Sequence, residues 1–157
     1  ETIMASTQAQ AAAAIRAELK RNNIAAQVVS RSASMMNAVD VTVTDLAPWT
    51  VKQISAFVGK FQAGSFDGMT DCYNYDNKHA DLPQVKYASV RANYSDATRQ
   101  QAWDWLRNYY GLEAAPESVD GAFNYRSEVF GEYGDTLLHR VLSGYIKGFW
   151  QKPRVRA

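Results

Sequence analysis

Residues 38–44 read Ala38-Val39-Asp40-Val41-Thr42-Val43-Thr44, and apolar and polar side chains alternate from Val39 to Thr44. Successive side chains of a β-strand point to opposite faces of the sheet, so the three valines share one face and Asp40 lies on the other. This pattern is typical of an antiparallel strand with one buried face and one wet face. It predicts a sheet in the N-terminal half of the chain.

The segments beside this strand predict two helices and a second strand. A helix is expected from a cap at Ser6 or Thr7 to about Asn22, because apolar residues recur on one stripe of it. A short strand is expected at 25–30, joined to residues 38–44 through an open hairpin tip. The next helix is expected to begin at Thr50, which has capping-box spacing to Gln53.

The C-terminal half also shows clear helix signals. A strand is expected at 85–91 and a helix at 97–110, the latter between a Ser95-Asp96 cap and Gly111. A strongly amphipathic helix is expected from Asp135 to about residue 149. Residues 112–134 are ambiguous, with a strand conceivable at 122–130, and Cys72–Tyr75 has the composition of another strand.

Together these elements predict an α+β fold. Its antiparallel sheet should have three or four strands with helices packed on one face, a helix–strand–strand–helix–loop–strand start and a C-terminal amphipathic helix. A length of 157 residues suits one domain over 1–157, because two smaller domains would bury little surface. Residues 1–6 and 151–157 are expected to be flexible ends.

Composition excludes several classes of protein. The net charge of +1 provides no global field that would recruit nucleic acid or an anionic membrane. Cys72 is the single cysteine, so an intramolecular disulfide and a cysteine-based zinc site are excluded. The chain has no uncharged apolar run of membrane-spanning length. We therefore expect a cytoplasmic protein that does not bind membranes.

Several motifs in the first 91 residues point to one family. They are Ile15–Lys20, the strand ending in Thr44-Asp45, the run Phe66-Asp67-Gly68-Met69-Thr70-Asp71, and Asp81–Tyr87. Over residues 9–91 the chain resembles the large polyvalent protein-associated domain of plasmids, phages and integrative elements. The loop Thr44–Pro48 departs from the family pattern, since it is longer and lacks a Gly. The resemblance implies a mobile genetic element and an association with proteins that counter host defence, without an established activity.

An acidic loop is the first candidate for chemistry. Asp67, Asp71, Asp76, His79 and Asp81 are close in sequence and could in principle hold Mg²⁺ or Mn²⁺. A metal-dependent hydrolase centred on this loop is therefore one alternative. The spacing matches no calcium loop, and Asp also caps backbone amides in turns, so a structural role is favoured.

A basic C-terminal segment is the second candidate. Residues 136–157 contain five bases and no acid, namely Arg140, Lys147, Lys152, Arg154 and Arg156. With the aromatic residues between them they could bind phosphates and stack on bases, which makes a nucleic-acid-binding module the other alternative. The competing interpretation is that the rings pack in the core and the bases are solvated.

The interpretation favoured here is a module that binds a protein and has no catalytic role. No residue is assigned to catalysis or to a metal, no cofactor is implied, and an enzyme is disfavoured without being excluded. The partner is expected to be a host protein of a defence or nucleic-acid-processing system, and the oligomeric state is open. Exposed Met and Tyr suit an interface, so the candidate contact residues are Met35, Met36, Phe66, Asp67, Asp71, Tyr73 and Tyr75.

Overall fold

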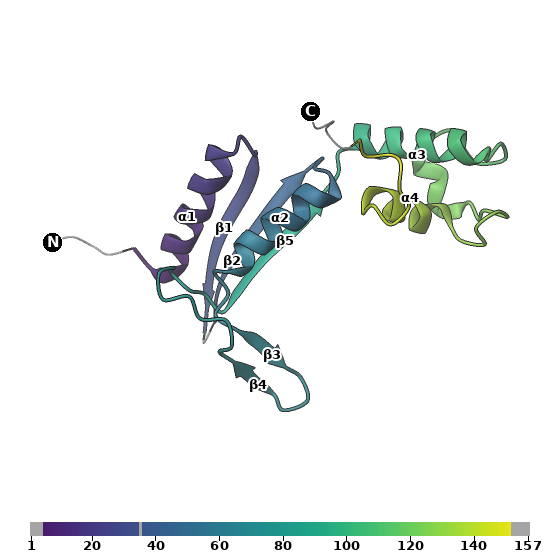
Figure 1. Cartoon of the computed structure of the whole chain (residues 1–157). Coiled ribbons are helices and arrows are strands. Elements are labelled where there is room, and N and C mark those ends of the chain that lie inside the picture. The colour runs from purple at the N-terminus through teal and green to yellow at the C-terminus, as the bar shows by residue number, and fades with distance from the viewer. Residues whose placement is uncertain (1–4, 35, 152–157) are drawn as a thin grey trace, which may run out of the picture. The chain divides into compact units, whose positions relative to one another are not determined.

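The computed structural model describes residues 5–34 and 36–151 (Figure 1). The chain forms two compact units, one within residues 1–44 and 49–93 and the other within residues 45–48 and 94–157. We call them the sheet unit and the helical unit. The single domain expected over 1–157 stays a prediction, and the ends expected to be flexible lie mostly outside the described residues. Within the described part, no helix is both long and apolar enough to cross a membrane.

The sheet unit begins with helix α1, Thr7–Arg21. Its start is the predicted one, because the Ser6 side chain accepts a hydrogen bond from the backbone N–H of Ala9. Asn23 has a left-handed φ of 58° and reverses the chain directly after the helix. The N–H of Ile24 bonds back to the carbonyl of Leu19 at 2.9 Å, so the chain enters the first strand beside the helix it has just left.

Three strands form the main sheet in the order β1-β2-β5. Strands β1 (Ala26–Ala33) and β2 (Met36–Thr44) are antiparallel, as predicted. Strand β5 (Tyr87–Asn93) pairs with β2 in parallel, so the sheet is mixed and the expectation of a wholly antiparallel sheet is corrected. The reason is the crossover through helix α2 (Pro48–Gly59), which returns the chain to the starting end of β2.

The two faces of this sheet differ as the alternation predicts. Val39, Val41 and Val43 are buried and form a core with side chains of α1 and α2, including Ile15 and Val58. The side chains that point to the opposite face of the sheet remain accessible, among them Gln27, Val29, Arg31, Ser89 and Arg91. The α+β class and the helix–strand–strand–helix start are confirmed, and both helices run alongside the strands (Figure 1).

Helix α2 starts at Pro48, two residues before Thr50, where the sequence predicted its start. Thr50 lies inside the helix, so the predicted capping box is wrong. Pro48 opens the helix instead, and proline suits a first turn because its fixed φ is helical and the N–H it lacks would have no partner there.

The helical unit contains α3 (Asp96–Tyr110), the short 3₁₀ helix η1 (Val119–Asn124) and α4 (Gly134–Leu142). The predicted caps of α3 are confirmed: the Ser95 hydroxyl accepts from the N–H of Thr98, and Gly111 ends the helix with φ of 62°. Trp103 is 0% exposed at the centre of the core, and its indole N–H donates to the carbonyl of Pro116 at 2.7 Å.

Two sequence predictions fail in this unit. The strand considered at 122–130 is replaced by η1 and by a single bridge between Arg126 and Tyr133. The final helix ends at Leu142, well short of the predicted residue 149. Gly144 and Gly148 have positive φ, and a Cβ at these positions would lie 2.7 Å from Pro48 and 2.8 Å from Trp105 respectively. The two glycines therefore serve close packing within this unit after the helix has ended.

Candidate functional site

In the long connection between α2 and β5, side-chain amides add to the backbone hydrogen bonds of a short parallel bridge. The Gln62 amide donates to the carbonyl of Gly64 at 2.7 Å and accepts from the N–H of Ala88 at 2.9 Å. The Asn77 amide donates to the carbonyls of Gly59 and Gln62. These amide side chains supply partners for backbone groups that no strand ladder pairs.

A short hairpin projects from this connection (Figure 1). It consists of β3 (Ser65–Asp67) and β4 (Cys72–Asn74), which confirms the strand expected at Cys72–Tyr75. The backbone approaches very closely at its base: a Cβ on Gly64 would lie 1.8 Å from the carbonyl oxygen of Asn74. Only glycine is compatible with that approach, so Gly64 determines where the hairpin emerges.

The hairpin tip explains two of the predicted aspartates. A carboxylate oxygen of Asp67 accepts a hydrogen bond from the N–H of Met69 at 2.9 Å. That bond, with further help from Thr70, lowers the pKa of the Asp67 carboxyl. Asp71 occupies a left-handed position with φ of 54°, which Asp tolerates better than most residues. Both aspartates thus shape the turn, and they present Met69 with 98% of its surface exposed.

Aromatic rings gather at the base of the hairpin. The ring centroids of Tyr73 and Tyr75 are 4.8 Å apart, and those of Tyr73 and Tyr87 are 5.8 Å apart, both edge to face. The Tyr73 hydroxyl donates to the carbonyl of Lys86 at 2.6 Å. Partial burial raises the pKa of this phenol, so it stays protonated as a donor at neutral pH. Tyr73 therefore anchors the group.

The other members of the group are more accessible. Phe66 pairs with Tyr73 across the hairpin and is 53% exposed, while Tyr75 is 60% exposed. The ammonium of Lys86 lies 5.2 Å from the centre of the Tyr73 ring, and that of Lys78 lies 5.7 Å from Tyr75. We call this group the tyrosine patch; it comprises Phe66, Tyr73, Tyr75, Lys78, Lys86 and Tyr87.

A hollow of about 430 Å³ adjoins the patch. Its lining includes Met36 and Asn37 from the start of β2 together with Tyr75 and Lys86. The Asn37 side chain accepts from the N–H of Lys86 at 2.8 Å and ties the two segments together. The structure thus brings Met36 next to Tyr75, two candidates far apart in sequence. Met35, named with them, lies outside the described residues.

The acidic loop does not form a metal-binding cluster. Within residues 5–34 and 36–151, no three His, Cys, Asp or Glu side chains are grouped so that they could hold an ion. Asp76 accepts instead from the Ser65 hydroxyl, and the His79 ring contacts the Asn77 side chain. The geometry therefore gives the metal-dependent hydrolase no site in the described part of the chain.

The basic C-terminal candidates are only partly described. Arg140 forms an ion pair with Glu132 at 2.8 Å and lies 5.4 Å from the Tyr145 ring centre, so its charge is largely engaged within the unit. Lys147 is exposed. The Trp150 indole donates to the carbonyl of Leu142 at 2.9 Å, and Trp150 and Phe149 pack on the helical core, whereas Tyr145 is 78% exposed. Lys152, Arg154 and Arg156 lie outside the described residues.

Sequence reasoning missed four residues that shape this surface, one of which is Lys78 beside Tyr75. Lys86 and Tyr87 complete the patch from the start of β5, and Gln62 fixes the connection beneath it. Aromatic and basic neighbours at 86–87, so soon after the Tyr-rich stretch at 73–75, were an available signal. Nothing local indicated the two bonds of Gln62, because its partners come from both sides of the hairpin.

Comparison with known proteins gives one positive result. The model of a family described as large polyvalent protein associated domain 29 matches residues 6–103, more than half of the chain. No curated protein and no solved structure matches. The match contains the whole of the sheet unit's secondary structure and ends within α3, so the resemblance drawn from residues 9–91 is confirmed and extended. This chain belongs to the large polyvalent protein associated domain 29 family.

Proposed function

We propose that this chain is a non-catalytic, protein-binding module of a mobile genetic element, and that the tyrosine patch is its contact surface. Its expected partner is a host protein of a defence or nucleic-acid-processing system. One observation supports this most strongly: exposed aromatic rings lie beside an anchored tyrosine. Phe66 and Tyr75 are more than half exposed, while Tyr73 is held by its hydroxyl and by two ring contacts.

The chemistry of the patch suits protein recognition. Tyrosine is enriched in protein interfaces because a large rigid ring is desolvated at little cost in side-chain entropy. The hollow beside Met36 can accept a side chain of the partner, and Met adapts its shape to what it contacts. Lys78 and Lys86 add positive charge at the rim, which favours a partner with acidic groups around an apolar anchor.

The test compares two equally drastic surface changes. Host-cell extract is passed over wild-type protein, a Phe66→Ala/Tyr75→Ala variant and a Phe123→Ala/Tyr145→Ala variant, whose residues are exposed in the helical unit. We expect proteins retained by the wild type to be retained by the helical-unit variant and lost by the patch variant. A purified partner is then titrated against all three. Retention by both variants alike would reject the patch as the contact surface.

A further inference from the structure

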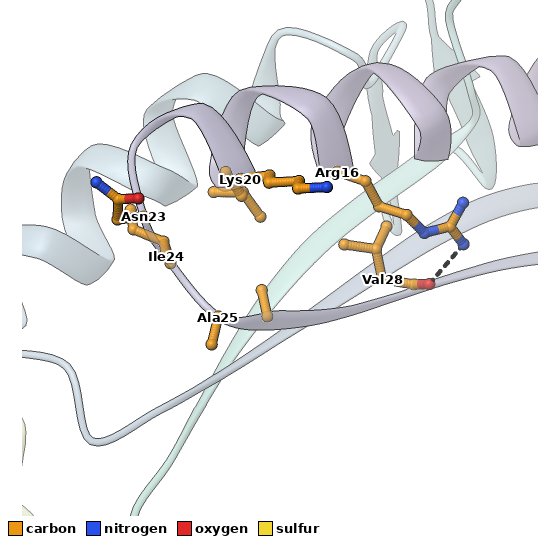
Figure 2. Close-up of a pocket in the computed structure, with 8 residues that line it drawn as sticks. Arg16, Lys20, Asn23, Ile24, Ala25 and Val28 are labelled. Atoms are coloured by element: carbon orange, nitrogen blue, oxygen red, sulfur yellow. Dashed lines mark hydrogen bonds between the residues drawn. The ribbon is translucent and has the colours of Figure 1, made fainter.

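A groove runs between α1 and the free edge of β1, away from the tyrosine patch residues. It has a volume of about 470 Å³, and its walls include Leu19, Ile24 and Val28 with the two bases Arg16 and Lys20. Figure 2 shows the Arg16 guanidinium reaching from α1 to the carbonyl of Val28, with Lys20, Ile24 and Ala25 around the same hollow. The groove therefore combines an apolar floor with a basic rim.

The backbone of β1 offers unused pairing positions along this groove. Within the described sheet, β1 has a neighbour on one side only, which is β2. The Val28 carbonyl accepts from Arg16 at 2.8 Å, so it points away from β2. In an antiparallel strand the N–H and C=O of a residue point the same way and alternate between neighbours. The backbone groups of Ala26 and Ser30 therefore also face outward, while Gln27 and Val29 pair with β2.

The opposite edge of the sheet, which is formed by β5, differs from the β1 edge. At β5 the outward N–H of Ala88 already bonds to the Gln62 side chain, inside a segment fixed by several amides. At β1 the Val28 carbonyl on the outer edge is bonded by Arg16, a long side chain that is exposed and can turn away. A new strand can therefore be added at β1 by displacing one guanidinium, without disturbing the backbone.

The geometry points to a docking site for an acidic, extended peptide segment, which adds to the sheet as a fourth strand beside β1. Its backbone pairs with Ala26, Val28 and Ser30, and its apolar side chains face Leu19 and Ile24. Arg16 leaves the Val28 carbonyl and, with Lys20, meets a carboxylate of the peptide. The positive charge of Arg16 and Lys20 favours an acidic peptide in this groove. The nearby Glu18 is already paired with Arg21, and the residues that line the groove include no acid.

A capped heptapeptide, Thr-Val-Thr-Asp-Thr-Val-Thr, is the probe, because alternate residues place Val, Asp and Val toward the helix. Its counterpart with Lys in place of Asp is the charge control. Titration into ¹⁵N-labelled full chain should shift the amides of residues 26–30, and the Lys peptide should bind at least about tenfold more weakly. Hydrogen exchange should slow at Ala26, Val28 and Ser30 and change little at Gln27 and Val29, whose amides are already bonded.

Three variants separate strand addition from simple charge attraction. Arg16→Glu/Lys20→Glu should weaken binding at least about tenfold, and Lys52→Glu on α2, an equally exposed base, should not. Ser30→Pro removes one outward N–H, a change that edge strands tolerate, and should also weaken binding. Should that variant fold poorly, a peptide N-methylated at the amides facing β1 makes the same test without touching the protein.

Several results would overturn the proposal. They are equal binding of the Asp and Lys peptides, no binding at about 1 mM peptide, and amide shifts without slowed exchange at Ala26, Val28 and Ser30. Exchange that slows at these amides with rising protein concentration and no peptide would show that a second copy of the chain occupies the edge. Binding by the N-methylated peptide as tight as by the parent would exclude strand addition.

Discussion

Trp103 of the helical unit is used for packing, whereas Phe66 and Tyr75 of the sheet unit stand exposed at a projecting hairpin. Trp103 is 0% exposed and hydrogen bonded to Pro116. Tyr75 is 60% exposed, yet its ring still has a fixed neighbour in Tyr73. Aromatic content alone therefore does not separate buried rings from exposed ones. What distinguishes the two kinds of ring is whether the rest of the unit covers them. Substitutions of buried and of exposed rings can test this distinction.

The largest effect should come from the buried ring. We expect Trp103→Ala to lower the free energy of unfolding of the helical unit by about 3–5 kcal/mol, since it leaves a cavity and orphans the Pro116 carbonyl. Chemical denaturation followed by amide NMR measures this unit by unit. Phe123→Ala, an exposed aromatic in the same unit, is the control and should change little. A loss below about 1 kcal/mol for Trp103→Ala would contradict its central role.

The base of the hairpin should be the next most sensitive position. Gly64→Ala places a Cβ against the Asn74 carbonyl oxygen, so the hairpin must shift and we expect a loss of about 2 kcal/mol or more. Ring-to-ring contacts between Tyr73 and Tyr75 should weaken in NOE spectra.

Gly68→Ala is the matched control for this change. A Cβ at Gly68 meets no atom within 4 Å, and the expected change is within about 0.5 kcal/mol. Equal effects of the two substitutions would mean that the close approach at Gly64 does not determine the hairpin.

A smaller effect is expected at the anchor of the tyrosine patch. Tyr73→Phe keeps the ring but removes the bond to the Lys86 carbonyl, which should cost about 1 kcal/mol in thermal unfolding. The matched change Tyr75→Phe removes a hydroxyl from a side chain that is mostly exposed and should be nearly neutral. If Tyr75→Phe proved the more costly of the two, the assignment of anchor and exposed ring would be reversed.

The smallest effect concerns the accessible face of the sheet. A hydrogen bond from Arg31 is the main cause that lowers the pKa of the Asp40 carboxyl below 3.8. A carboxyl with a lowered folded pKa contributes stability that is present above its unfolded pKa and is lost as pH falls through the folded one. Because the pair is largely exposed, the contribution should stay below about 1 kcal/mol.

Unfolding measured at pH 6 and at descending pH below about 4 tests this sign. The stability of wild type should fall more steeply than that of Asp40→Asn over the acidic range. A wild-type curve that is parallel to the variant's would show that the Arg31 contact contributes nothing.

Much of the fold could be predicted because its causes are local. The Ser6 and Ser95 caps, the Gly111 stop and the alternation in β2 all act within a few residues, and all are confirmed. The direction of β5 was wrong because it depends on where a long crossover returns the chain, which no local pattern contains. The end of α4 was wrong because an apolar periodicity continues past Leu142 after the backbone has left the helix at Gly144.

Only part of the candidate site could be predicted from the sequence. Composition pointed to Phe66, Tyr73 and Tyr75, and the structure places them together; their role in binding stays a prediction. The proximity of Met36 to Tyr75 could not be predicted, since β2 and the hairpin meet only in the folded chain. The groove along β1 could not be predicted either, because it depends on which backbone groups of β1 pair with β2.

By itself the sequence determined the α+β class, the caps of α1 and α3 and the valine face of the sheet, since propensity, capping and alternation act between near neighbours. The tertiary structure alone decided that the loop aspartates shape a turn and that Tyr73 anchors a cluster completed by Lys86 and Tyr87. It also decided that, within the described sheet, β1 has a strand neighbour on one side only, beside two bases. These outcomes depend on contacts between distant segments, which exist only once the chain has paid the entropy of bringing them together.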